Sequence, residues 1–144
     1  MRILVAEDNS FKKAHIVSVL KEVVPDAEID VRRAFSSSIH KLLRSREKYD
    51  LAILDDTMPH YEQDPNSDII QNCAELFLDY LDEYGIEETK CIICSAYDSS
   101  NKEEQFKHLK NNYKNCIGFV KYECNSVVWT DKMKEMIQKN YGQE

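Results

Sequence analysis

Short runs of apolar residues alternate with amphipathic stretches along the whole chain. Three of the five runs are almost continuously hydrophobic, as expected for strands that are covered on both faces of a parallel sheet. The predicted strands are Ile3–Ala6, Glu28–Ala34, Leu51–Leu54, Lys90–Cys94 and Cys116–Val120. The stretch of sequence that follows each predicted strand is long enough for one helix.

In the stretches between these runs, apolar residues recur every three or four positions, which predicts five helices with one buried face each. Ser36 and Ser126 are suited to cap helix N-termini, and Gly85 is suited to end the third helix. The expected buried faces are Ile16, Leu20 and Val23; Ile39, Leu42 and Leu43; Ile69, Cys73, Leu76, Phe77, Tyr80 and Tyr84; Phe106, Leu109 and Tyr113; and Trp129, Met133, Met136 and Ile137.

The order strand–helix, repeated five times, predicts an α/β fold. We expect a doubly wound, five-stranded parallel sheet of the (βα)₅ type with right-handed crossovers. Residues 1–144 are expected to form a single domain, without a linker or an internal repeat. The stretch 59–67 is polar and contains two prolines, so we predict an elongated surface loop there.

Polar residues follow four predicted strands at their carboxyl ends, which a parallel sheet gathers at one rim: Glu7 and Asp8, Asp55 and Asp56, Ser95, and Lys121. Two carboxylates about 4 Å apart repel each other by about 4 kcal/mol at an effective dielectric constant of about 20. A divalent cation removes that repulsion, and a set of oxygen ligands favours Mg²⁺ over zinc. An anionic group on Asp55 would then meet a metal, an ammonium and a hydroxyl.

Four motifs stand on these strand ends in order: LVAEDN, LAILDDTMP, IICSA and FVK. On them the chain resembles the receiver domain of bacterial response regulators, including single-domain regulators of the chemotaxis type, from its first strand to its last. The resemblance implies a flavodoxin-like fold. It also implies that Asp55, three residues before Met58, accepts a phosphoryl group.

By the same resemblance the chain binds Mg²⁺ as its cofactor. Asp8 and Asp55 are the implied direct ligands, and Glu7 is the implied ligand through a water molecule. The position of Thr57, two residues after the acceptor, implies that its backbone carbonyl completes the metal shell.

The implied function is that of a switch rather than an enzyme, with self-catalysed phosphotransfer and autodephosphorylation as its only reactions. A sensor histidine kinase or a histidine phosphotransfer protein is the implied donor, and Ser95 and Lys121 are the implied ligands of the phosphoryl group. A separate protein is the implied target, bound through the fourth helix, the fifth strand and the fifth helix. The candidate residues on that surface are Lys107, Lys110, Tyr122 and Lys132.

The chain departs from the family pattern in several places. Gly118 stands where the family has an aromatic switch residue, and Phe119 should face the other side of the strand. Tyr122 replaces the proline after the lysine, so we expect a trans peptide or a rearranged loop. Tyr97 borders the expected acyl phosphate, and we hypothesise that its bulk slows attack by water. The loop 59–67 is either partner-specific or a tolerated insertion.

Composition narrows the function further. The 144 residues carry a net charge of −7, which disfavours binding to nucleic acid. The N-terminus is not a signal peptide, and no apolar run approaches the roughly 20 residues that cross a bilayer, so a cytoplasmic protein without membrane insertion is expected. Cys91 and Cys94 should lie on opposite faces of a strand, and all five cysteines are expected to be apolar fillers.

Rival functions are weighed against the same residues. Haloacid-dehalogenase-type phosphatases need a second aspartate two residues after the nucleophile, where this chain has Thr57, and Toprim domains fail on the same spacing. A degenerate receiver that acts as a phosphorylation-independent interaction module stays open, and so does a homodimer. Asp56 and the lysines of the last two helices are expected to be solvated.

Overall fold

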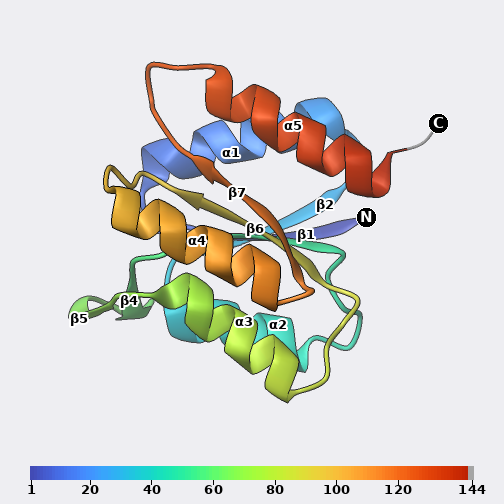
Figure 1. Ribbon diagram of the computed structural model, residues 1–144. Coiled ribbons are helices and arrows are strands. Elements are labelled where there is room, and N and C mark those ends of the chain that lie inside the picture. The colour runs from blue at the N-terminus through green and yellow to red at the C-terminus, as the bar shows by residue number, and fades with distance from the viewer. Residues whose placement is uncertain (143–144) are drawn as a thin grey trace.

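The computed structural model describes residues 1–142, with the backbone alone described for residues 65–67. At its centre lies a five-stranded parallel sheet in the order β2-β1-β3-β6-β7 (Figure 1). The strands are β1 (Arg2–Ala6), β2 (Glu28–Arg32), β3 (Leu51–Leu54), β6 (Lys90–Ser95) and β7 (Cys116–Lys121). The predicted α/β class and the five predicted strands are confirmed.

Within residues 1–142, five helices cover the sheet in two layers, one on each face (Figure 1). The helices are α1 (Ser10–Val23), α2 (Phe35–Arg44), α3 (Cys73–Glu83), α4 (Ser100–Asn112) and α5 (Val128–Tyr141). One layer packs against the sheet through the α1/α5 core, which includes Ile16, Leu20, Trp129 and Met133. The other packs through the α2/α3/α4 core, which includes Leu42, Phe77 and Phe106. Within residues 1–142, no helix combines the length and the apolar character that crossing a membrane requires.

The helix ends differ in part from the predicted caps. α2 begins at Phe35, so Ser36 lies inside the first turn, where a hydroxyl cannot serve as the N-cap. α5 begins at Val128, so its N-cap residue is Val127 and not Ser126. The Ser126 hydroxyl, one residue earlier, accepts the Val128 N–H over 3.1 Å. Gly85 follows the end of α3 as predicted, with a φ of 69° that suits glycine.

The stretch predicted to be a loop, 59–67, belongs to a β-hairpin instead. β4 (Met58–Tyr61) and β5 (Asp64–Ile70) pair antiparallel across a two-residue turn. Ile69, assigned to the third helix on its apolar spacing, lies in this hairpin, and α3 begins at Cys73.

An apolar contact across the base of the hairpin favours its formation. Met58 lies opposite Ile70 in the ladder, and a cross-strand apolar pair of this kind stabilises a hairpin. Within β4, the ring of His60 stacks on that of its neighbour Tyr61, with the centroids 4.1 Å apart. The loop prediction rested on the prolines and polar residues between Met58 and Ile70, and a two-stranded edge tolerates proline.

Where β7 pairs with β6, it contains one residue more than β6 does. Cys91 pairs with Cys116, whereas the next residue of β6, Ile92, pairs with Gly118, so that Ile117 forms a β-bulge. Because side chains alternate along a strand, the bulge exchanges the two faces for every residue that follows it.

The residues after the bulge show this exchange. Gly118 lies against α5, where a β-carbon would collide with Sδ of Met136. Phe119 packs on the α2/α3/α4 core, which confirms that it faces away from the side of Gly118. Val120 lies in the α1/α5 core, so Lys121 returns to the face of Phe119.

The cysteines follow the prediction with one exception. Cys91 lies in the α2/α3/α4 core and Cys94 in the α1/α5 core, which confirms that they face opposite sides of β6. Four cysteines are buried and all five are free thiols. Cys124 is exposed, so the prediction that every cysteine fills the core is wrong there, because this residue lies in the connection between β7 and α5.

Candidate metal centre at the strand ends

Three carboxylates meet at the carboxyl ends of β1 and β3. Glu7, Asp8 and Asp55 each offer one oxygen, and these oxygens lie within 4.8 Å of one another. The sheet fixes their backbone: the Glu7 N–H donates to the Arg32 carbonyl over 3.0 Å, and the Asp55 N–H donates to the Ala6 carbonyl over 3.2 Å. Folding therefore gathers the acidic residues that the sequence predicts at this rim.

A buried lysine from α1 enters the acidic cluster. The backbone N–H of Lys12 donates to the N-cap residue Asn9 over 2.9 Å, which places Lys12 in the first turn of the helix. Its Nζ lies 2.8 Å from Glu7 Oε1 and 3.1 Å from Asp55 Oδ1, and it donates to the Cys94 carbonyl over 2.7 Å. Sequence reasoning missed this residue, because a lysine among the polar positions of an amphipathic helix is usually solvated.

Burial and mutual repulsion shift the protonation of these groups. Burial, followed by repulsion from Asp55, raises the pKa of Glu7 from 4.5 to about 7, against the attraction of Lys12. Burial also raises the pKa of Asp55, although Lys12 and the Asp56 backbone N–H oppose it. Burial by itself lowers the pKa of Lys12, but the attraction of Asp55 and Glu7 outweighs it and leaves that pKa above its ordinary value. Negative charge is costly here, and a further cation is favoured.

The donor set fits a divalent cation. Oε1 of Glu7 is buried and lies 2.8 Å from the Lys12 ammonium, yet it has no hydrogen bond of suitable geometry within the described residues. With all three carboxylates ionised, one ammonium leaves two negative charges uncompensated, which is the charge of one such ion. Carboxylate oxygens with access to water are ligands of Mg²⁺.

The other predicted site residues lie at the same rim. Ser95 is buried and pairs with Lys121 in the ladder between β6 and β7, and the Tyr122 N–H donates to the Ser95 carbonyl over 2.9 Å. Lys121 is exposed, and its Nζ lies 5.8 Å from the centre of the Tyr97 ring. Thr57 is exposed. No described peptide is cis, as expected with Tyr122 in place of proline.

Comparison with known proteins relates this arrangement to a family. No protein-family model matches the chain. It is 26% identical over 150 residues to the Detocs response regulatory protein DtcB of Enterobacter cloacae, which covers 96% of this chain and 99% of that protein. Its structure is similar to a CheY-like response regulator receiver domain protein from Methanospirillum hungatei, with a TM-score of 0.67, 16% identity, and 96% and 91% of the two chains covered.

Two further solved structures agree. A response regulator receiver domain from Rhodospirillum rubrum gives a TM-score of 0.70 at 12% identity and covers 100% of this chain and 96% of its own. The Mn²⁺-bound form of response regulator Rcp1 gives a TM-score of 0.65 at 13% identity and covers 99% of this chain and 94% of its own. The chain has the fold of response regulator receiver domains. The flavodoxin-like architecture predicted from the strand–helix pattern is thereby confirmed.

A partly buried ion pair lies beside the acidic cluster. Asp56, expected to be solvated, is only 3% exposed. It pairs with Lys102 of α4 and accepts the Ala74 backbone N–H at the start of α3 over 3.3 Å. The prediction of a solvated side chain is wrong because the starts of both helices cover this strand end. Asp56 therefore connects the end of β3 to α3 and α4.

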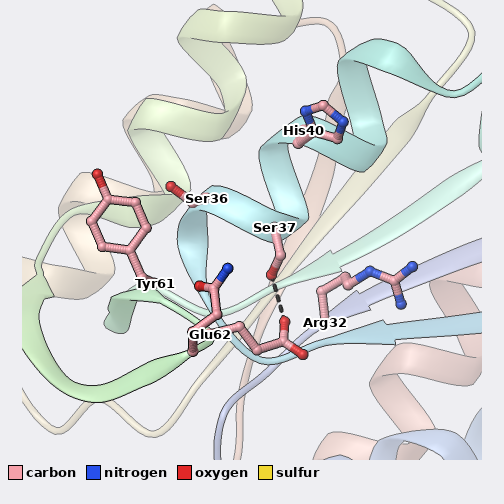
Figure 2. Close-up of a pocket in the computed structure, with 7 residues that line it drawn as sticks. Arg32, Ser36, Ser37, His40, Tyr61 and Glu62 are labelled. Carbon is pink, nitrogen blue, oxygen red and sulfur yellow. Dashed lines mark hydrogen bonds between the residues drawn. The ribbon is translucent and has the colours of Figure 1, made fainter.

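The hairpin formed by β4 and β5 extends the rim beside α2. A hollow of about 650 Å³ lies between the hairpin and α2. Figure 2 shows the side chains that line it, among them Ser37, whose hydroxyl donates to Glu62 Oε1. A neighbouring hollow of about 410 Å³ is lined by Asp8, Arg33 and Glu62, among others. The Arg33 guanidinium donates to the Asp8 backbone carbonyl over 3.3 Å. The hairpin thus borders the acidic cluster.

Proposed function

We propose that this receiver domain is a phosphorylation switch. Asp55 accepts a phosphoryl group, in a Mg²⁺-dependent reaction, from a sensor histidine kinase or a histidine phosphotransfer protein, and the change alters binding to a separate partner. The observation that carries the proposal is the position of Asp55 inside a carboxylate cluster that fits a divalent cation. The similarity to a response regulatory protein over nearly the whole chain supports it.

The residues around Asp55 suit this chemistry. Bound Mg²⁺ supplies neutralisation of the charge on the phosphoryl oxygens. Asp8 and Asp55 would hold the ion directly, with Glu7 through water and the Thr57 carbonyl as a further ligand. The Asp56 backbone N–H donates to Asp55 Oδ1 over 2.8 Å and so orients the carboxylate for in-line attack.

The response to transfer involves the ends of β6 and β7. Ser95 is proposed to donate its hydroxyl to the phosphoryl group. The family resemblance gives Lys121 a contact with the same group, but the Lys121 ammonium lies over the Tyr97 ring in the resting structure, so that contact requires the side chain to move. Movement at Ser95 and Tyr97 would alter the surface at the start of α4.

The partner surface is proposed to lie over α4, β7 and α5. A groove of about 590 Å³ runs there, and its rim carries lysines from both helices, which suits an acidic partner. The lysines that line it are Lys107, Lys110, Lys132 and Lys139. Tyr122 was predicted for this surface, but it is buried in the α1/α5 core and so does not belong to the proposed partner surface.

Incubation with acetyl phosphate and Mg²⁺, followed by intact mass spectrometry, tests the proposal. One phosphoryl group per chain is expected on the wild-type protein and none on Asp55→Asn, whereas the matched variant Asp56→Asn should still be labelled. Chelation of the metal should abolish labelling. A wild-type protein that remains unlabelled under these conditions would refute the proposal.

Two controls separate the rival functions. A degenerate receiver would show no change in the resonances around Ser95 when beryllofluoride and Mg²⁺ are added together. A phosphatase would hydrolyse p-nitrophenyl phosphate continuously, whereas a receiver domain takes up one equivalent of phosphoryl group from acetyl phosphate.

A further inference from the structure

The ammonium beside the acceptor carboxylate comes from a helix rather than from a strand end. We propose that Lys12, not Lys121, is the lysine that neutralises Asp55 in the resting receiver domain and binds the phosphoryl group after transfer. This inference rests on the proposed function, since it concerns the same acceptor. It reassigns a role that the family resemblance gives to Lys121.

The contacts of Lys12 support the assignment. An ammonium has three N–H donors, and the Lys12 Nζ lies within 3.1 Å of three oxygens, those of Glu7, Asp55 and the Cys94 carbonyl. These oxygens belong to the ends of β1, β3 and β6, so one side chain joins three strands at the site. The Lys12 side chain is only 7% exposed. Its Nζ also lies 5.6 Å from the centre of the Tyr122 ring.

The direction of Lys121 supports it independently. Val120 packs in the α1/α5 core, and the alternation of side chains along β7 therefore turns Lys121 toward α4. Its ammonium lies there, over Tyr97. Lys12 approaches Asp55 from α1, on the opposite face of the sheet. The bulge at Ile117 causes this arrangement, because a regular strand would turn Lys121 to the side of α1.

Charge explains what Lys12 contributes to the transfer. One carboxylate oxygen of Asp55 forms a bond to phosphorus while the bond between phosphorus and the acyl oxygen of acetyl phosphate breaks, and acetate leaves with the electron pair. Lys12 exchanges no proton in this step. The phosphoryl group adds negative charge to a site that already holds Glu7 and Asp8, and the ammonium is positioned in advance to stabilise it.

Two measurements with opposite expected signs test the role of Lys12. In Lys12→Met the site loses a positive charge, so Mg²⁺ should bind at least about tenfold more tightly, because a charge about 4 Å away acts strongly in a buried site. At saturating Mg²⁺, labelling by acetyl phosphate should nevertheless be about 100-fold slower, the effect of removing one preorganised electrostatic contact. A merely structural defect would weaken both binding and labelling.

The fluorescence of Trp129 reports Mg²⁺ binding without any need for activity. Trp129 is the single tryptophan of the chain, and its ring lies 4.9 Å from that of Tyr122, which contacts Lys12. Lys13→Met, one position along α1, is the matched control and should change labelling by less than about fivefold. Lys121→Met is the comparison variant, and it should slow labelling much less than Lys12→Met, because the Lys121 ammonium lies over the Tyr97 ring and not beside Asp55.

Lys12→Gln provides a second test if the methionine variant does not fold, because its amide can still donate to the Cys94 carbonyl. It should show the same tighter Mg²⁺ binding and slower labelling. Normal labelling of both Lys12 variants at saturating Mg²⁺, with slow labelling of Lys121→Met, would overturn the inference and leave the proposed function standing. An unlabelled wild-type protein would refute both.

Discussion

The metal-free protein should become less stable as the pH rises through neutrality, and Glu7 is the main cause. Its pKa in the folded protein is about 7, against an ordinary value of 4.5, because its carboxylate is buried beside Asp55. Between about pH 4.5 and pH 7, Glu7 of the folded state therefore keeps a proton that the unfolded chain has already released. At about 1.4 kcal/mol per pH unit, the difference of about 2.5 is equivalent to about 3 kcal/mol of stability.

This contribution is fully present below about pH 4.5 and is lost as the pH rises through about 7. Asp55 acts in the same direction, since its pKa is also raised by burial. Urea unfolding in the presence of a chelator, at intervals from pH 5 to pH 8, measures the loss. Glu7→Gln is the control because it cannot ionise, and its stability should fall less over this range than that of the wild type.

Saturating Mg²⁺ should reverse much of the loss, because the ion binds the ionised carboxylates of the folded state alone. The release of protons on addition of Mg²⁺ near pH 6.5, measured with a pH indicator, should be smaller for Glu7→Gln than for the wild type. The reasoning is refuted if the free energies of unfolding of wild type and Glu7→Gln run parallel from pH 5 to pH 8 without metal.

Other predictions concern residues around the same rim. Tyr97→Ala should accelerate loss of the phosphoryl group, followed by intact mass after removal of the donor; an unchanged lifetime would exclude a shielding role. Asp56→Asn should lower the free energy of unfolding by about 2 kcal/mol, because it leaves the Lys102 ammonium without its buried partner, and a double-mutant cycle with Lys102→Met measures the coupling. Gly118→Ala should cost about 1–3 kcal/mol through contact with Met136, and Met136→Ala in the same chain should recover part of it.

The strand–helix alternation was sufficient to predict the positions of Glu7, Asp8 and Asp55. Each stands directly after or soon after an apolar run, and a parallel sheet must bring such positions to one rim. The polarity pattern carries this information because both faces of the sheet are buried. Gly85 was predictable for a local reason, since the chain there needs a positive φ.

Other parts of the site were not accessible from the pattern. Lys12 and Asp56 both belong to residue types that are normally solvated, and their burial depends on elements far away in sequence: β6 for Lys12 and α4 for Asp56. The hairpin was missed because its turn carries no glycine, although Met58 and Ile70 pair across it. These are tertiary effects, which override what a short window of sequence suggests.

The bulge in β7 shows how the pairing of one strand can reorganise a site without any substitution in it. If Ile117 entered the ladder opposite Ile92, every later residue of the strand would move one place along β6, and the last lysine would turn from the tyrosine ring to the side of α1. Such a change of register would place two ammonium groups on the side from which one now reaches the acceptor, and the lysine on α1 would then be free to vary. A shift of register in this strand is therefore one step by which such a domain can exchange one cation at the acceptor for another.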